Sequence, residues 1–354
     1  MLDAVSPIWR TTTAPYGPTF LGLARVLLAL TGKSLVAGIF ALRLAEIAGI
    51  ALVAGSVPRL ARALGTDPAL ATFLAAFSPL VLLELIAAGH NDALMAGLLV
   101  VGVTLAMEEH PLLGVACCAL GASLKVPAAA GMVLVTIAWA RAETSNARRF
   151  VVVAQAAAAS IAILGVASVA TGLGLGWIST SVISTPGIVH LAITPATALG
   201  RTLAGALDVV SLHVGALGVE TLLGHVFLGL LALAGVLAAW KVRRENLVLV
   251  LAAVLLVAVL LGPALWPWYL TWAMSLYAAC AGAQRSRLLV LGLATAPVLV
   301  KADGIFLLHL DLSPVVVVVA VICVAIWLTW RARLKQPHVP SAVSAGMPAG
   351  RRSP

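Results

Sequence analysis

The chain has 354 residues, of which 62% are hydrophobic and only 10% are charged, and its mean hydropathy is +1.10. A soluble domain carries about 25% charged residues, so this composition excludes an ordinary soluble fold and predicts an all-α polytopic membrane protein. The net charge of +9 does not indicate nucleic-acid binding, because the basic residues form short clusters between apolar runs, as in the cytoplasmic loops of membrane proteins.

The first part of the chain, residues 1–18, is polar and lacks the basic start and apolar core of a cleavable signal peptide. The apolar run 20–30 is too short to span a bilayer, so we expect it to lie along the interface or to re-enter beside a site. Runs of about 16–22 apolar residues follow as spanning candidates. They are 36–57, 68–88, 93–108, 111–124, 126–140, 150–171, 221–240, 246–263, 268–283, 287–302 and 314–331. The pair 111–124 and 126–140 is short and predicts a tight hairpin or a tilted pair.

Lysine and arginine set the expected orientation. Fifteen of the 22 basic residues fall on one side when the eleven runs are counted alternately. This distribution predicts an outside N-terminus and a cytoplasmic C-terminus. Residues 1–335 would form one transmembrane domain, and the Pro-, Ser- and Gly-rich tail 336–354 is predicted to be disordered.

The outer face would then receive the polar stretches. They are 1–19, 89–92, 172–220, 262–266 and 301–314. The stretch 172–220 is predicted to be non-helical, contains Trp177, His190 and Arg201, and is longer than a connector needs to be. The unusual chemistry of the chain is therefore predicted on one side of the membrane.

Ionisable groups interrupt the apolar sequence at Gly89-His90-Asn91-Asp92. Such groups at membrane depth are a functional-site hypothesis by default, because an unpaired charge there is costly. Asp92 could accept a proton from an attacking hydroxyl or orient His90 for that task, and Asn91 could hold a sugar hydroxyl. Equally, Asn91 or Asp92 could cap the helix that starts at residue 93, and the two roles are compatible.

Two further cations lie within or beside apolar runs. Lys125, on the predicted outer side, could bind a phosphate as a point charge, or could extend toward the membrane surface. Arg43 precedes Glu46 by three residues on one helix face, which predicts an internal ion pair. Alternatively, Arg43 could bind a lipid phosphate with Glu46 as its partner.

Two aromatic segments contain proline. Arg10 and Tyr16 belong to the first, and Trp268 and Tyr269 to the second. Interfacial aromatic belts explain such residues without a ligand, but aromatic faces beside polar groups also suit sugar rings. The four cysteines lie inside apolar runs without metal-ligand spacing, so no metal or cofactor is expected.

Four sequence blocks occur in a fixed order along the chain. They are Ala14-Pro15-Tyr16-Gly17-Pro18, Gly89-His90-Asn91-Asp92-Ala93-Leu94-Met95, Leu124-Lys125-Val126-Pro127 and Trp266-Pro267-Trp268-Tyr269-Leu270. In these blocks the chain resembles the polyprenol-phosphomannose-dependent α-1,6-mannosyltransferases of actinobacteria. Those are integral-membrane glycosyltransferases of the GT-C class, and the resemblance covers the chain to about residue 335.

The resemblance implies a GT-C-like helical bundle in the plasma membrane and a reaction on its outer face. Mannose would pass from polyprenyl-phosphate-mannose to a lipid-linked mannan acceptor, for lipomannan and lipoarabinomannan synthesis. The acceptor 6-hydroxyl attacks with inversion, a carboxylate takes its proton, and cations stabilise the departing phosphate without a metal. Asp92 and His90 become the catalytic candidates, and the substrate-binding candidates are Asn91, Lys125, Tyr16, Arg10, Trp268, Tyr269 and Arg43.

The chain departs from this family at its start. Members normally have a first helix and a large outer loop with an acidic residue before the Pro-Tyr-Gly-Pro segment, whereas Asp3 is the only carboxylate there in this chain. The chain is therefore expected to lack the N-terminal part of the family. Two other hypotheses remain: an inactive truncated copy, and a transporter or flippase with Arg43, Glu46 and Glu84 along its pathway.

Overall fold

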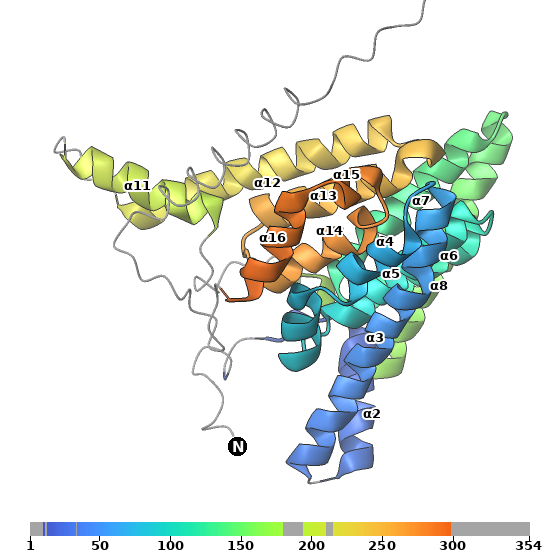
Figure 1. Cartoon of the computed structure of the whole chain (residues 1–354), viewed down its shortest axis with the longest axis horizontal. Helices are drawn as coiled ribbons and strands as arrows, with labels where there is room; N and C mark the ends of the chain where they lie inside the picture. Colours follow the sequence, from blue (N-terminus) through green and yellow to red (C-terminus); the bar gives the residue numbers. More distant parts are fainter. Residues whose placement is uncertain (1–9, 11–12, 33, 180–193, 210–214, 299–354) are drawn as a thin grey trace, which may run out of the picture. The chain divides into compact units, whose positions relative to one another are not determined.

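The computed structural model describes residues 10, 13–32, 34–179, 194–209 and 215–298 (Figure 1). All regular secondary structure in these ranges is helical, which confirms the predicted all-α class. The predicted run 314–331, the loop 301–314, the tail 336–354, Asp3 and His190 lie outside the described residues.

The helices of ordinary length follow the predicted apolar runs, except for α11. They are α2 (Pro18–Thr31), α3 (Leu35–Ala63), α4 (Pro68–Ala76), α5 (Asp92–Met107), α6 (Pro111–Leu124), α7 (Ala129–Ala142), α8 (Asn146–Thr171), α11 (Pro195–Val209), α12 (Ala216–Lys241), α13 (Leu247–Leu261), α14 (Leu270–Tyr277) and α16 (Arg287–Thr295). Shorter segments connect them. These are the π-helix η2 (Val81–Ala87), the 3₁₀ turns η3 (Val126–Ala128), η5 (Arg244–Asn246), η6 (Pro267–Tyr269) and η7 (Ala296–Val298), and the single turns α9 (Gly176–Ser179) and α15 (Ala281–Gln284).

Four of the described helices are long and apolar enough to cross a membrane: Leu35–Ala63, Asn146–Thr171, Leu217–Lys241 and Arg244–Leu261. They correspond to the predicted runs 36–57, 150–171, 221–240 and 246–263. A bent pair, α4 with η2, makes a fifth candidate. Several shorter apolar helices accompany them, among them α2, α5 and α6. The helices therefore fit a membrane protein, while the count of eleven crossings and their direction stay predictions.

Two runs predicted as single spans are broken. Run 68–88 forms α4 and η2, which are bent by 49° to each other. Pro79 lies in this break, where it can neither donate a backbone hydrogen bond nor pack against the preceding turn of a straight helix. Run 268–283 divides into η6, α14 and α15.

The stretch 172–220 is not the non-helical loop that we predicted. Its described parts contain α9, α11 and the start of α12. Trp177 is buried, and its indole N–H donates to Ser168 Oγ of α8 at 3.0 Å. Arg201 of α11 pairs with Glu220 of α12 at 3.0 Å, so this part of the chain is held to its neighbours by specific contacts.

Close helix packing sets the centre of the bundle. α5 lies between α3 and α6, and glycines line both contacts. A Cβ atom on Gly97 would lie 2.5 Å from the Gly49 carbonyl oxygen, and one on Gly102 would lie 2.6 Å from the Gly114 oxygen. Small residues therefore let these backbones approach each other, as they do between membrane helices generally.

Charged contacts join the helix connections that were predicted to share the basic face. Arg59, near the end of α3, donates to Glu108 with its Nε at 2.9 Å, and Arg244 pairs with Glu109. Both carboxylates belong to the turn between α5 and α6. One end of the α5–α6 hairpin is thus held by ion pairs, and the polar block 89–92 lies at its other end.

Candidate functional site

The Pro-Tyr-Gly-Pro segment lies against the C-terminal end of α6. The Gly17 N–H donates to the Leu124 carbonyl at 2.9 Å. A Cβ atom on Gly17 would lie 2.1 Å from the Ser123 carbonyl oxygen, so only glycine allows this approach. The contact places Tyr16 beside Lys125, the residue that follows α6.

Lys125 and Asp92 form a buried ion pair. Lys125 leaves α6 in an extended conformation, with φ −154° and ψ 129°, and only 8% of the residue is exposed. Its Nζ donates to both carboxylate oxygens of Asp92, at 2.9 and 2.8 Å. Asp92 is the first residue of α5, is 1% exposed, and accepts a further hydrogen bond from the Trp272 indole. Both of its oxygens therefore have partners.

Aromatic rings enclose the Lys125 ammonium. Its Nζ lies 4.6 Å from the ring centre of Tyr269, 5.5 Å from that of Trp272 and 5.9 Å from that of Tyr16. Ring faces stabilise a cation that has lost its water. Burial raises the pKa of the Tyr16 phenol, which keeps this hydroxyl protonated as a hydrogen-bond donor. The Lys125 ammonium has three N–H donors. Two of them bind the Asp92 carboxylate, so one is left for another acceptor.

His90 belongs to a second, adjoining group of rings. It stacks on Trp268 with ring centres 3.8 Å apart, and Trp268 stacks on Trp266 at 5.0 Å. Its Nε2 lies 3.9 Å from Glu84 Oε2. Burial lowers the pKa of His90 to about 4, although the nearby charge of Asp92 acts in the opposite direction. The imidazole is therefore neutral at physiological pH.

The predicted ion pair between Arg43 and Glu46 is wrong for the described structure, because each side chain has another partner. Arg43 donates to the Ile86 carbonyl at the end of η2. It also lies over Gly89, where an added Cβ atom would be 3.7 Å from Arg43 Nη1. Glu46 is 2% exposed and accepts a hydrogen bond from the Leu94 N–H.

The predicted local cap of α5 is also wrong. Asn91 occupies the N-cap position, but its side chain makes no capping hydrogen bond, and the Asp92 carboxylate is directed to Lys125 instead. Glu46, from α3, accepts one of the free N–H groups of the first turn of α5, which a local cap normally does. In this case the cap comes from a different helix.

Two buried polar atoms of this region have no hydrogen-bond partner among the described residues: Asn91 Nδ2 and Glu46 Oε2. Buried polar groups in native proteins are nearly always paired, with protein, water or ligand. A donor and an acceptor are therefore available beside the Lys125–Asp92 pair.

Comparison with known proteins identifies the family. Residues 1–141 match the model described as alpha-(1->6)-mannopyranosyltransferase, N-terminal domain, and residues 193–333 match the MptB C-terminal domain. The chain belongs to the alpha-(1->6)-mannopyranosyltransferase family. This finding confirms the family indicated by the four sequence blocks.

Three curated relatives show the extent of the match. Alpha-(1->6)-mannopyranosyltransferase A of Mycobacterium tuberculosis is 34% identical, over 86% of this chain and 60% of the relative. A probable alpha-(1->6)-mannopyranosyltransferase of Mycolicibacterium smegmatis is 33% identical, over 77% and 54%. Alpha-(1->6)-mannopyranosyltransferase A of Corynebacterium glutamicum is 30% identical, over 76% and 58%. The chain thus spans between half and two thirds of the length of these relatives. No solved structure matches it.

The structure of this family member brings most of the predicted site residues together. Asp92, Lys125, Tyr16 and Tyr269 surround the buried ion pair, and His90 and Trp268 form the adjoining stack. Asn91 lies between these groups in the sequence, and Arg43 lies over Gly89. Arg10 is exposed and stays a prediction.

Three residues of the site were not among the predicted site residues: Glu46, Glu84 and Trp272. Trp272 follows Trp268 by four positions, and such spacing puts two side chains on the same face when the segment is helical. That spacing was the available signal. The sequence singles out Glu46 only as the partner of Arg43 and, with Glu84, as a carboxylate inside an apolar run on the pathway of the transporter hypothesis.

Proposed function

We propose that the chain transfers mannose from polyprenyl-phosphate-mannose to a lipid-linked mannan acceptor. The product would be an α-1,6 linkage, made on the outer face of the plasma membrane for lipomannan and lipoarabinomannan. The observation that supports this most directly is the buried Lys125 ammonium, held by Asp92 and enclosed by aromatic rings. The relatives' names support the mannosyl group and the linkage.

Lys125 would bind the donor phosphate. The third N–H of the ammonium can donate to a phosphate oxygen, and a charge-assisted hydrogen bond is strong where water is excluded. When the bond from the anomeric carbon to the phosphate oxygen breaks, the phosphate gains negative charge, so a fixed cation stabilises the transition state more than the bound donor. Arg43, above Gly89, is a second cation within the same region.

Asp92 would act as a positioning residue. Its two oxygens already accept hydrogen bonds from Lys125 and Trp272, which leaves it poorly placed to take a proton from a hydroxyl. His90 is better placed for that role, because its imidazole is neutral and part of it reaches the surface. The acceptor 6-hydroxyl would lose its proton to His90, and Glu84 would stabilise the resulting imidazolium.

The remaining groups would hold the sugar rings. Trp268, which is only partly buried, is an aromatic side chain of the kind that sugars contact, and Trp266 supports it from below the surface. Asn91 Nδ2 and Glu46 Oε2 offer a donor and an acceptor to sugar hydroxyls. These contacts would favour a polar, hydroxyl-rich substrate over an apolar one.

A transfer assay tests the proposal. Membranes containing the intact protein receive labelled polyprenyl-phosphate-mannose and an α-mannoside acceptor, and the product is analysed for mass and linkage. We expect an α-1,6-linked product, and a loss of at least about a hundredfold in Lys125→Ala, since removal of a single stabilising donor can cost this much. Lys241→Ala, a change at an exposed lysine at the end of α12, is the control.

Two outcomes would contradict the proposal. Unchanged turnover in both Lys125→Ala and Asp92→Asn would show that this ion pair is not part of the transfer site. Movement of the lipid-linked sugar across proteoliposomes, with no covalent product, would favour the transporter hypothesis.

A further inference from the structure

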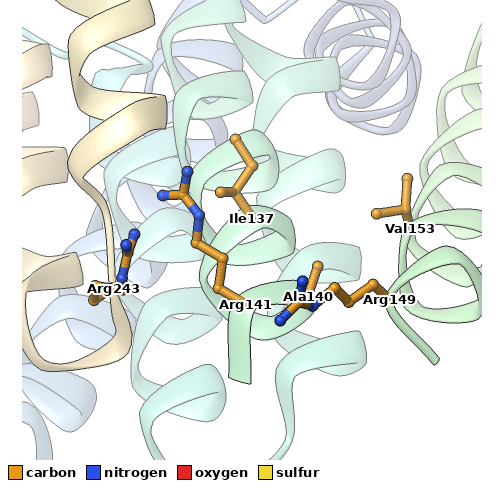
Figure 2. Close-up of a pocket in the computed structure, with 6 residues that line it drawn as sticks. All are labelled: Ile137, Ala140, Arg141, Arg149, Val153 and Arg243. Atoms are coloured by element: carbon orange, nitrogen blue, oxygen red, sulfur yellow. The ribbon is translucent and has the colours of Figure 1, made fainter. Parts of the chain in front are cut away.

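A pocket of about 440 Å³ lies apart from the Lys125 region, at the opposite end of α7 (Figure 2). Three arginines and three apolar residues line it: Arg141, Arg149, Arg243, Ile137, Ala140 and Val153. Its volume lies within the range of small-ligand sites, which is about 300–1,000 Å³. The 14 residues of α7 rise about 21 Å, so the pocket is well separated from Lys125, which precedes that helix.

The three arginines come from three different segments, as Figure 2 shows. Arg141 is in the last turn of α7, Arg149 in the first turn of α8, and Arg243 follows α12. Backbone carbonyls hold all three. Val242 O accepts from Arg141 Nη1 at 2.7 Å and from Arg243 Nη1 at 3.1 Å, and Glu143 O accepts from Arg149 Nε at 3.1 Å. Each guanidinium has five N–H donors, so this anchoring leaves others for a ligand.

The positive charge of the pocket is not neutralised by the described residues. Arg141 and Arg243 are close enough to repel each other. The carboxylate of Glu143, between α7 and α8, pairs with Arg148 at 3.9 Å, and none of the three pocket arginines forms an ion pair with a described carboxylate. Like charges held together in this way favour an anion between them.

The apolar lining indicates the class of anion. Val153 is exposed, as is Phe150 one turn earlier on the same face of α8, and α8 is long and apolar enough to cross a membrane. A ligand here would meet guanidinium groups and apolar side chains in the same pocket. Basic pockets between membrane helices bind the phosphate groups of anionic lipids in this way.

We propose that this pocket binds a phosphate group, supplied by the headgroup of an anionic phospholipid. The site is independent of the mannosyl-transfer site and uses none of its residues. A soluble phosphate ion could make the same contacts with the arginines but would not use the apolar lining.

Lipid titration of the purified full chain in a neutral detergent tests the proposal. Native mass spectrometry measures the binding of phosphatidylglycerol, with zwitterionic phosphatidylcholine, whose headgroup has no net charge, as the comparison. We expect affinity for phosphatidylglycerol to fall about fivefold in Arg243→Gln and about a hundredfold when all three arginines become glutamine, at roughly 1 kcal/mol for each charge. Arg148→Gln is the matched control, because Arg148 neighbours Arg149 but does not line the pocket.

Each outcome decides a specific point. Equal binding of phosphatidylglycerol by the native protein and by Arg243→Gln would overturn the proposal, and this single change at an exposed residue avoids the risk that the triple variant does not fold. Inorganic phosphate that binds without lipid, and that Arg243→Gln releases, would keep the phosphate site but overturn the lipid source. Equal binding of phosphatidylcholine would overturn the role of charge.

Discussion

Asp92 and Lys125 stand 33 positions apart in the sequence and are joined by two hydrogen bonds, at 2.9 and 2.8 Å. The pair ties the start of α5 to the end of α6, in surroundings where both side chains have lost nearly all contact with water. A buried charge without its partner is strongly destabilising, whereas removal of both charges together is much less so.

We therefore expect Asp92→Asn and Lys125→Met each to destabilise the protein by about 3–5 kcal/mol, and the double variant by clearly less than the sum. Unfolding in one fixed detergent measures all three. Arg201→Ala, which removes a half-exposed partner of Glu220, is the comparison and should cost no more than about 1 kcal/mol. Strict additivity of the two single changes would show that the pair is not coupled.

Gly17 should be intolerant of a side chain. In Gly17→Ala the new Cβ would meet the Ser123 carbonyl, so the segment that carries Tyr16 must move away from Lys125. We expect a loss of about 1–3 kcal/mol from overpacking, together with weaker transfer. Gly55→Ala is the matched control, because nothing lies within 4 Å of the added Cβ and alanine favours a helix. Equal melting temperatures of the two variants would contradict this placement of the segment.

The pH dependence of transfer should report the protonation state of His90. Because burial lowers its pKa to about 4, the native imidazole stays neutral where an ordinary histidine, with a pKa near about 6.5, is already protonated. Transfer that needs the neutral imidazole should therefore persist at pH 5.5 and decline toward pH 4. The kcat/KM profile of the native protein measures this. His110→Gln should leave it unchanged, and an acid limb near pH 6.5 would contradict the burial of His90.

The same shift affects stability. Below about pH 6.5 the unfolded chain takes up a proton at His90 while the native chain does not, so the free energy of unfolding should fall as the pH decreases toward 4. His90→Gln should reduce this dependence. An unchanged pH dependence of unfolding in that variant would assign the effect to other groups.

Substitutions can separate the two roles of Glu46, which are to cap α5 and, as we propose, to bind substrate. Glu46→Gln keeps an oxygen for the Leu94 N–H, so the fold should be nearly as stable while substrate affinity changes. Glu46→Leu removes that oxygen and leaves a buried donor unpaired, at a cost of about 1–3 kcal/mol. Thermal unfolding and the KM for the acceptor distinguish the two variants. If Glu46→Gln alters neither quantity, Glu46 has no part in substrate binding.

The sequence predicted which residues come together in the candidate site better than it predicted their partners. His90, Asp92 and Lys125 stand out because ionisable groups are rare in apolar runs. Their pairing depends on how α5 packs against α6, and that packing is set by glycines such as Gly102 and Gly114, which lie far from the site. No local spacing shows this.

The incorrect prediction of an Arg43–Glu46 ion pair also shows that local spacing does not reveal tertiary partners. A spacing of three residues does bring Arg43 and Glu46 to one helix face, but it says nothing of competing groups elsewhere. Ile86 has a free carbonyl because η2 ends nearby, and Leu94 has a free N–H because α5 begins nearby. Each is a partner that only tertiary structure supplies.

The shortness of α5 and α6 has a consequence for the surrounding lipid. With 16 and 14 residues they rise about 24 and 21 Å, less than the roughly 30 Å of a bilayer's hydrocarbon core. If their ion-paired turn lies at one membrane surface, the ends that hold Asp92 and Lys125 stop several ångströms below the other. Water and lipid headgroups must then descend to meet them, so the bilayer should be locally thin above the ion pair. Access to the site should therefore depend on the thickness of the bilayer. In membranes with longer acyl chains, we expect substrates to reach the Asp92–Lys125 pair less easily.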